Sequence, residues 1–465
     1  MACARCTISF ALLATTATIA LVAGCARQPY AARPLDLAAE QTRRAAQTLE
    51  APALRAYLDA HGVRPLPVQT WGLSELTLTA FFYRPALQAA RARGRAARET
   101  ALQAARRPPP TVRPLVEHHS ASNAADTPWS LGFEVELPLV LASRREPLIR
   151  RAQAEAEAAE LEAGAMAWQI RSDVRTRLLE LAAARQRLAS FEAEIEAQRA
   201  VVAMLEKRRE LGYAASTDVD TARIRLSDAQ AAFASTRSEA QAALGRLAEA
   251  TGVPLAALEA AQLSFADFGV LPDAPPASET RTRALQNRTD LRRSLLEFEA
   301  ADAAVKLQIA QQYPTIALRP GYLWDQGDNV WSLALDLALP GRLEHAVRAT
   351  EARREAAAQQ ALATQSSVLG EIDTRRASYE TLHAAAAASD AATRDQSVRA
   401  QQMQRQFDIG QIDRLEYTLT RIETLRAQRR ADAARAEAQR ALGQLEDAMQ
   451  MPISGGPLPT ALHAR

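Results

Sequence analysis

The chain has 465 residues, with 56 basic and 54 acidic side chains and a formal net charge of +2, and almost all of its basic residues are arginine. This near balance of charge does not indicate a nucleic-acid partner, because binding to a phosphate backbone calls for a clear excess of basic residues. Aromatic residues make up only 5% of the chain, and alanine and arginine are abundant. That composition favours long helices over one large globular core.

The N-terminal segment has the features of a bacterial lipoprotein signal. An uncharged apolar run over residues 8–23 leads into Val-Ala-Gly-Cys at residues 22–25, which has the form of a lipoprotein processing site. We expect the mature chain to begin at a lipid-modified Cys25; a plain secretory signal with an incidental cysteine is the alternative. Cys3 and Cys6 would be removed with the signal. The mature chain would then have no disulfide framework, cysteine metal site or cysteine nucleophile.

The two halves of the chain repeat one pattern. Several short matches keep their order at an offset of about 200 residues, which indicates an internal repeat. The matched positions are Arg84 and Leu87 with Arg288 and Leu291, residues 110–112 with 314–316, residues 129–131 with 331–333, residues 137–138 with 339–340, and residues 211–212 with 409–410. Each half is predicted to form a helix, a strand, a loop, a second strand, a very long helix, a tight turn and a returning helix.

Alternating side chains predict the second strand of each half. Apolar residues stand at every second position over residues 129–139 and 331–339, and the residues between them are small or acidic, including Glu134, Glu136 and Asp336. Such alternation also fits a half-buried strand of a soluble sandwich. The very long helices that follow, and aromatic residues near the strand ends, instead favour transmembrane strands with an interfacial aromatic girdle. These aromatic residues are Trp129, Tyr322, Trp324 and Trp331.

Shorter partner strands are predicted over residues 111–119 and 315–323, each starting directly after a proline. Polar loops follow them at residues 120–128 and 325–329. We expect these loops to form hairpin tips that face the outside.

A very long helix is predicted over residues 147–211, where apolar residues recur at heptad spacing without an interrupting proline. At 1.5 Å per residue, about 65 residues make a rod on the order of 100 Å long, which suits a periplasmic crossing. Its length equals that of the returning helix, residues 217–250, added to that of the next ascending helix, residues 281–312. We therefore expect these two helices to lie end to end beside it.

The second half predicts the same arrangement. Its long helix is expected over residues 341–409 and its returning helix runs through residue 449, with residues 73–107 as the matching ascending helix. Between the halves, the proline-rich segment 254–278 is predicted to form an irregular belt around the middle of the rod.

Four strands per chain are too few to close a membrane barrel, since about eight is the smallest number seen and an open sheet edge is not tolerated in lipid. Outside the N-terminal segment, no run of about 18 apolar residues could cross a bilayer as a helix. Several chains would therefore share one barrel. A barrel continued by helices encloses a lumen, so the geometry predicts conduction.

Two motifs carry a resemblance to a known family. Residues 288–291, Arg-Thr-Asp-Leu, resemble its common Arg-Pro-Asp-Leu, and residues 407–410, Phe-Asp-Ile-Gly, are followed by Asp413 and Leu415. With its paired repeats, the chain resembles the outer membrane efflux protein (TolC-like) family, lipoprotein branch, over nearly its whole mature length. The resemblance implies a homotrimer with a transmembrane β-barrel of four strands per chain, continued by a long α-helical coiled-coil periplasmic tunnel.

The resemblance also implies partners and functional positions. The partners are a periplasmic adaptor (membrane fusion) protein, an inner-membrane efflux pump, and outer-membrane lipid through Cys25. The candidate positions are the adaptor-docking tips Leu211, Gly212, Tyr213, Ile409, Gly410 and Gln411, and the periplasmic gate candidates Asp218, Asp220 and Asp413. The glycines also suit plain helix ends, and aspartate at a helix start is often a cap.

The acidic residues of the predicted strands are candidate lumen groups. Repeated by symmetry, Glu134, Glu136 and Asp336 would form acidic rings that favour cations near the exit. Solvated lumen charges without selectivity are the alternative.

These observations predict an α+β membrane protein that is the exit duct of a tripartite efflux system in the outer membrane, passing drugs or metal ions. A type I protein secretion duct and a non-conducting periplasmic coiled-coil lipoprotein are the alternatives. No enzyme activity, cofactor or metal site is predicted: the six histidines are scattered, and His118 and His119 lack further ligands. The expected segments are residues 1–24 (lipoprotein signal peptide), 25–70 (lipidated and equatorial segment), 71–280 (first efflux repeat), 281–450 (second efflux repeat) and 451–465 (C-terminal tail).

Overall fold

The computed structural model describes residues 30–120 and 127–453 of the chain. The predicted signal peptide, the lipidation site Cys25, most of the first hairpin tip and the end of the C-terminal tail lie outside the described residues. The chain divides into two units, residues 1–46 and 47–465. Each unit is described by itself below.

The first unit contributes helix α2 (Leu37–Ala45), which begins at Asp36, where the carboxylate accepts two backbone N–H groups of the first turn. The second unit holds the other described elements. In chain order these are α3 (Pro52–Ala60), α4 (Leu73–Tyr83), α5 (Pro85–Ala105), β1 (Thr111–His118), β2 (Trp129–Leu139), α6 (Ala142–Glu210), α7 (Ser216–Thr251), α8 (Leu255–Glu259), a short 3-10 helix (Ala266–Phe268), α9 (Ala277–Asn287), α10 (Thr289–Ala310), β3 (Thr315–Asp325), β4 (Asp328–Ala338), α11 (Glu344–Asp408) and α12 (Arg414–Met449).

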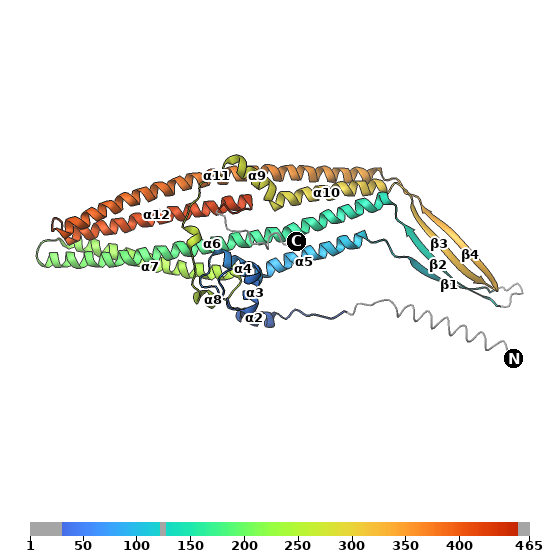
Figure 1. Cartoon of the computed structure of the whole chain (residues 1–465), viewed down its shortest axis with the longest axis horizontal. Coiled ribbons are helices and arrows are strands. Elements are labelled where there is room, and N and C mark those ends of the chain that lie inside the picture. The colour runs from blue at the N-terminus through green and yellow to red at the C-terminus, as the bar shows by residue number, and fades with distance from the viewer. Residues whose placement is uncertain (1–29, 121–126, 454–465) are drawn as a thin grey trace. The chain divides into compact units, whose positions relative to one another are not determined.

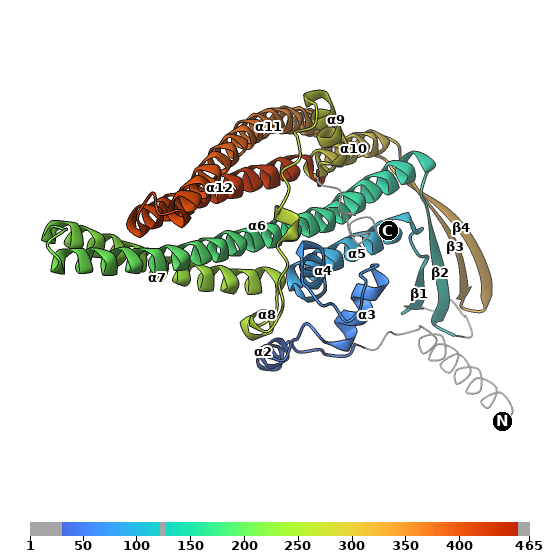
Figure 2. The ribbon, with the colours of Figure 1, turned by 60° about the vertical axis from the view of Figure 1, so that its left-hand side comes forward.

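Two long helical hairpins run through the second unit, α6 with α7 and α11 with α12 (Figure 1). Helix α5 lies beyond α7 along α6, and α10 lies beyond α12 along α11 (Figures 1 and 2). Each returning helix thus adjoins the ascending helix of its own half, and the prediction that residues 217–250 and 281–312 lie end to end was wrong. Length could not decide between these pairings, because α5 and α10 are almost equally long. Helix α6 has 69 residues and α11 has 65. The predicted heptad positions Val174, Leu181 and Ile195 of α6 are buried, so the narrow apolar stripe does hold the helices together. None of the described helices contains a stretch that is both long and apolar enough to cross a membrane.

Each ascending helix is broken, and the prediction of one continuous helix in each half was wrong. Helix α4 gives way to α5 at Arg84, and α9 gives way to α10 at Arg288, because both arginines have an extended backbone with ψ of 119° and 113°. In the first half Pro85 explains the break, since proline disfavours helical backbone in the residue before it. In the second half the Asp290 carboxylate accepts hydrogen bonds from the N–H of Leu291 and from the Arg288 guanidinium, which stabilises the same break.

The two matched arginines make matching contacts. Arg84 donates to Asp173 of α6 at 2.9 Å and to a carbonyl oxygen in the last turn of α7. Arg288 donates to Glu371 of α11 at 2.9 Å and to a carbonyl oxygen in the last turn of α12. Cations near the C-terminal end of a helix satisfy its free carbonyl groups. The repeated arginine therefore fastens each broken helix to the long hairpin beside it.

The strands form one antiparallel sheet in the order β1-β2-β3-β4. Strands β3 and β4 are longer than predicted, because they meet at a two-residue turn, Gln326-Gly327, with φ of 51° and 112°. The predicted loop over residues 325–329 was therefore too long. Where β2 pairs with β3, a Cβ on Gly132 would lie 2.2 Å from the carbonyl oxygen of Tyr322, so only glycine fits there.

The main apolar core lies beside the middle of α6. Helices α3, α4 and α8 cover α6 and the end of α7 there. Helix α8 belongs to the segment 254–278 that was predicted to form a belt, whereas α3 and α4 come from earlier in the chain. The fully buried side chains of this core include Leu54, Leu58, Leu76, Phe81, Ile170, Leu178, Leu181, Leu247 and Leu258. A second core joins α9, α11 and α12 around Ile372 and Tyr379.

The linker between the two halves crosses the second hairpin. Side chains of α11 and α12 hold its backbone: Gln439 donates to the carbonyl oxygen of Val270 at 2.7 Å, and the Tyr379 hydroxyl donates to that of Pro272. Arg376 adds a hydrogen bond at 3.0 Å farther along the linker. Residues 270–276 of the linker are thus fixed to the helices although they form no helix or strand.

Candidate functional site

The sheet has one exposed apolar face. The alternate residues of β4 on this face are largely exposed, with Trp331 at 79% and Leu333 at 72%. Aromatic rings gather on the same face near the hairpin turn, where Tyr322 lies 4.8 Å from Trp331 and 6.2 Å from Phe133 between ring centroids. A soluble sandwich would bury these side chains, so the sandwich alternative was wrong. An exposed apolar band with an aromatic end is the pattern of a lipid-facing strand surface.

The opposite face of the sheet carries the three predicted lumen acids, and the structure places them in one charged cluster. Arg319 of β3 lies 2.5 Å from Asp336, 3.3 Å from Glu136 and 3.8 Å from Glu134. Arg113 of β1 lies 3.1 Å from Glu134. The acids are therefore paired with two guanidinium groups, which the sequence reasoning did not include. The alternation of side chains along the predicted partner strands, β1 and β3, places both arginines on this face and could have predicted them.

The outer end of the same face holds a second polar cluster. The buried Ser130 donates to Asp325 at 2.5 Å, and Nε2 of His119 lies 2.9 Å from the Ser130 hydroxyl oxygen. Because that hydroxyl donates its only proton to Asp325, the imidazole N–H is the donor to it. The serine is thus a bridge between strands, since a catalytic serine would instead donate to histidine. His118 packs edge-on against Trp129.

The two predicted docking tips have the same backbone. Gly212 and Gly410 have φ of 79° and 76°, the left-handed conformation that ends a helix, and space around each would accommodate a Cβ. In both tips the residue after the glycine donates its N–H five residues back, at 2.7 Å and 2.8 Å, which is a Schellman motif. The glycines are therefore explained by backbone conformation. Around them the side chains of Leu211, Tyr213, Ile409 and Gln411 are exposed.

One of the three gate candidates links the two hairpins. Asp413 accepts the N–H of Glu416 at 2.9 Å as the cap of α12, and it also accepts a hydrogen bond from Arg208 of α6 at 2.6 Å. The backbone N–H of Glu416 and the guanidinium of Arg208 lower the pKa of Asp413 below its usual value. This carboxylate is therefore charged at neutral pH and ties the end of α6 to the start of α12.

The other two candidates make local contacts within the first hairpin. Asp218 accepts the N–H of Ala215 at 3.1 Å, which stabilises the start of α7. Asp220 is exposed and lies 3.8 Å from Arg223 on the same helix. Neither residue reaches the second hairpin among the described contacts.

A buried ion cluster ties α6 to α12 farther from the tips. The Glu194 carboxylate, with its side chain 3% exposed, contacts the guanidinium groups of Arg426, at 2.8 Å, and Arg429. The Arg429 guanidinium also lies over the ring of Phe191, 4.3 Å from its centroid. Sequence reasoning missed this cluster because charged residues on a coiled coil usually face water.

The belt holds a second buried network between the same two helices. Arg175 donates to the backbone and side-chain oxygens of Gln439 at 2.9 and 3.0 Å, and it lies 3.5 Å from Glu446. Arg171 also contacts Glu446, at 3.4 Å. Burial lowers the pKa of the Arg175 guanidinium, and the Glu446 carboxylate opposes that shift. A Cβ on Gly443 would lie 2.3 Å from this guanidinium, so any larger residue at this position in α12 would displace the Arg175 side chain from its hydrogen bonds.

Two further polar groups complete this region. Burial raises the pKa of Asp447, although its carboxylate accepts hydrogen bonds from Ser172 at 2.5 Å and from the indole of Trp168 at 2.9 Å. Burial also raises the pKa of Tyr379 to about 12, so its hydroxyl keeps its proton and its bond to the linker. Asp447 thus ties α12 to α6, and Tyr379 ties α11 to the linker.

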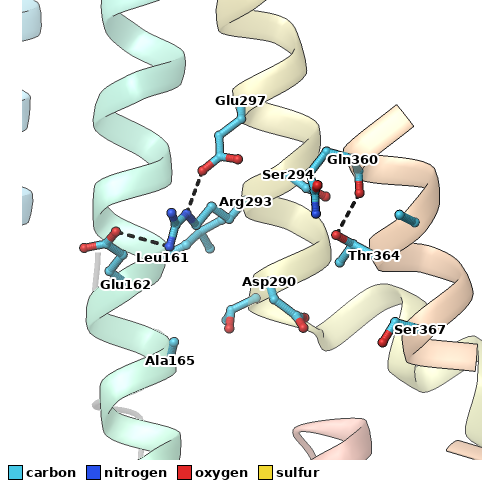
Figure 3. Close-up of a pocket in the computed structure, with 12 residues that line it drawn as sticks. Leu161, Glu162, Ala165, Asp290, Arg293, Ser294, Glu297, Gln360, Thr364 and Ser367 are labelled. Carbon is cyan, nitrogen blue, oxygen red and sulfur yellow. Dashed lines mark hydrogen bonds and ion pairs between the residues drawn. The ribbon is translucent and has the colours of Figure 1, made fainter. Parts of the chain in front are cut away.

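Figure 3 shows an open groove of about 570 Å³ between α6, α10 and α11. Arg293 stands in it between Glu297, at 2.8 Å, and Glu162, at 3.4 Å. Arg293 is thus paired with two carboxylates, and the rest of the groove is lined by one aspartate and a mixture of apolar side chains and serine, threonine and glutamine. Within residues 30–120 and 127–453, no group of three or more histidine, cysteine, aspartate or glutamate side chains is arranged to hold a metal ion.

The fold and these surfaces define a class of membrane protein in which a small sheet with an apolar outer face continues into long paired helices. Residues 80–253 and 281–449 match the model of the outer membrane efflux protein family. These two segments make up most of the chain, so the chain belongs to that family and is a protein of the outer membrane. The predicted family and the predicted fold class are both confirmed.

Solved structures show the same fold. The chain is similar to the outer membrane protein VceC from Vibrio cholerae, with a TM-score of 0.66 and 21% identity over 82% of this chain and 97% of that one. It is also similar to the Campylobacter jejuni CmeC outer membrane channel, with a TM-score of 0.65 and 14% identity over 92% and 95%. The open-state Neisseria gonorrhoeae MtrE outer membrane channel gives a TM-score of 0.62 and 15% identity over 82% and 89%. No curated protein sequence matches the chain significantly.

Proposed function

We propose that three copies of this chain form the exit duct of a tripartite efflux system, passing small molecules such as drugs or metal ions from an inner-membrane pump and a periplasmic adaptor to the exterior. The observation that carries the proposal is the sheet, whose exposed apolar face lies opposite a charged face. Four strands cannot close in lipid, so several copies must share one barrel, and the charged faces then line a lumen. Family membership supports the same assignment.

The long helices would continue that lumen into the periplasm. Strand β2 runs into α6 and β4 runs into α11, so the wall of the proposed barrel leads directly into the two hairpins (Figure 2). Lipid attached to Cys25 would add an anchor in the outer membrane. A non-conducting coiled-coil lipoprotein would have no use for an exposed apolar sheet.

The helix turns are the proposed adaptor-docking sites. Both expose an apolar side chain before the glycine, Leu211 and Ile409, and the first also exposes Tyr213. Exposed apolar and aromatic side chains on rigid turns are suitable anchors for a partner protein.

The proposed gate is the contact between the two hairpins next to these turns. Arg208 and Asp413 form the tie nearest the tips, and both side chains are partly exposed. Breaking such a pair costs little, so binding of an adaptor could separate the two hairpins there. Asp218 and Asp220 remain gate candidates only through charge at the entrance.

The test is single-channel recording of the purified protein in a planar bilayer, with its molecular mass measured in detergent. Discrete conductance from a particle with the mass of three chains is expected. A non-conducting protein released into solution by removal of the lipid anchor would overturn the proposal and leave a periplasmic scaffold.

A further inference from the structure

We propose that Arg319 is a specificity-determining residue of the pore: its guanidinium offsets the lumen acids and holds down the preference of the channel for cations. The inference rests on the proposed function, because it needs the charged face of the sheet to line a conducting lumen. Arg319 stands on β3 in alternation with Leu318 and Pro320, so its side chain is on the face opposite the apolar band.

The geometry makes Arg319 the centre of the cluster. Its guanidinium reaches Asp336 on β4 at 2.5 Å and Glu136 on β2 at 3.3 Å, and so one cation spans three neighbouring strands. Glu134 lies 3.8 Å from its Nε and is shared with Arg113 on β1. The Arg319 side chain is 25% exposed, so its charge still acts on the solution beside the sheet.

The charge balance sets the direction of the effect. The cluster has three carboxylates and two guanidinium groups, which leave one negative charge in each chain. In a trimer this makes a ring with three negative charges, and removal of Arg319 would double that number. Acidic rings attract cations and repel anions in a pore.

The expected change follows from Coulomb's law. Three added negative charges that lie about 10 Å from a pore axis in water, screened with a Debye length of about 10 Å, raise the ratio of cation to anion permeability by roughly five-fold. The effect should shrink as salt concentration rises, because screening shortens the range of the field.

The experiment measures the reversal potential of the purified channel in a planar bilayer under a KCl gradient. The variant Arg319→Gln should shift that potential toward the value for a more cation-selective pore, and Arg319→Lys should not. Asp336→Asn should shift it in the opposite direction. The double variant Arg319→Gln with Asp336→Asn restores the native net charge and should return the potential close to that of the native channel.

Two controls separate the possible failures. Gel electrophoresis at increasing temperature measures how readily each variant trimer dissociates into monomers. A change in selectivity that is caused by a damaged barrel is recognised in this way. If the native protein conducts but Arg319→Gln keeps its reversal potential, the role of Arg319 is refuted while the channel stands. If the native protein does not conduct at all, the proposed function itself fails.

Discussion

Replacement of Glu194 by alanine should loosen α12 from α6 far more than its position on a charged coiled coil suggests. The Glu194 side chain is 3% exposed and serves two arginines, of which Arg429 is 16% and Arg426 is 43% exposed. Without the carboxylate, two like charges would face each other in a partly buried seam. Breaking a buried pair costs about 3–5 kcal/mol, but Arg426 can turn to water, so we expect roughly 2–3 kcal/mol.

Amide hydrogen exchange of α12 measures this loss directly. A loss of roughly 2–3 kcal/mol raises the exchange rate of amides over residues 418–432 by about 30- to 150-fold, because 1.36 kcal/mol corresponds to a factor of ten. Glu196→Ala is the matched control: Glu196 lies two residues away, its side chain is 65% exposed, and it pairs with Arg199 on the same helix. That surface pair is worth at most about 1 kcal/mol. Equal exchange in the two variants would refute the claim that Glu194 holds the seam.

Three further predictions concern the tip and the belt. Arg208→Ala should raise the open probability in bilayer recordings, whereas Arg209→Ala, which removes a charge without an ion pair among the described residues, should not. Because the pKa of Asp413 is lowered, its carboxylate stays charged and paired with Arg208 until the pH falls below that lowered value. The open probability of the native channel should therefore stay constant from neutral pH down to about 5 and rise only at lower pH. Gly443→Ala should destabilise the protein by about 1–3 kcal/mol in thermal melts, since its Cβ would displace Arg175, while Gly245→Ala, with open space around it, should be neutral or stabilising. Tyr379→Phe should reduce the loss of stability between pH 10 and about 12, because the unfolded tyrosine ionises first and the native hydroxyl keeps its proton; an unchanged pH dependence of the melting temperature would contradict this.

Periodicity alone predicted the long helices and the sheet correctly, because each buries or exposes one regular face. The stripe through Val174 and Leu181 follows the heptad of α6, and the alternation over residues 129–139 follows the pleat of β2. The helix breaks were missed for a different reason. At Arg288 no proline interrupts the sequence, and the break depends on hydrogen bonds that the Asp290 carboxylate accepts and that only the folded chain reveals.

The candidate site was predicted less completely, because ion pairs between distant segments leave no local pattern. The three lumen acids were found by alternation, but Arg319, which pairs with all of them, lies more than 180 residues from Glu134 and Glu136, in the other half of the chain. The same holds for Glu194 with Arg429 and for Arg175 with Glu446. In these cases the packing of segments far apart in the chain brings the two partners together, and neither segment alone indicates the pair.

The polar ties along the seam between α6 and α12 weaken from the belt toward the tips. At the belt the carboxylate of Glu446 is 1% exposed, farther along that of Glu194 is 3% exposed, and at the tip that of Asp413 is 53% exposed. Removing a buried partner leaves an uncompensated charge, whereas a broken surface pair is solvated at once. The seam therefore separates most easily at the tip, next to the proposed docking turns. A partner that binds there acts where the least energy is needed to part the two hairpins.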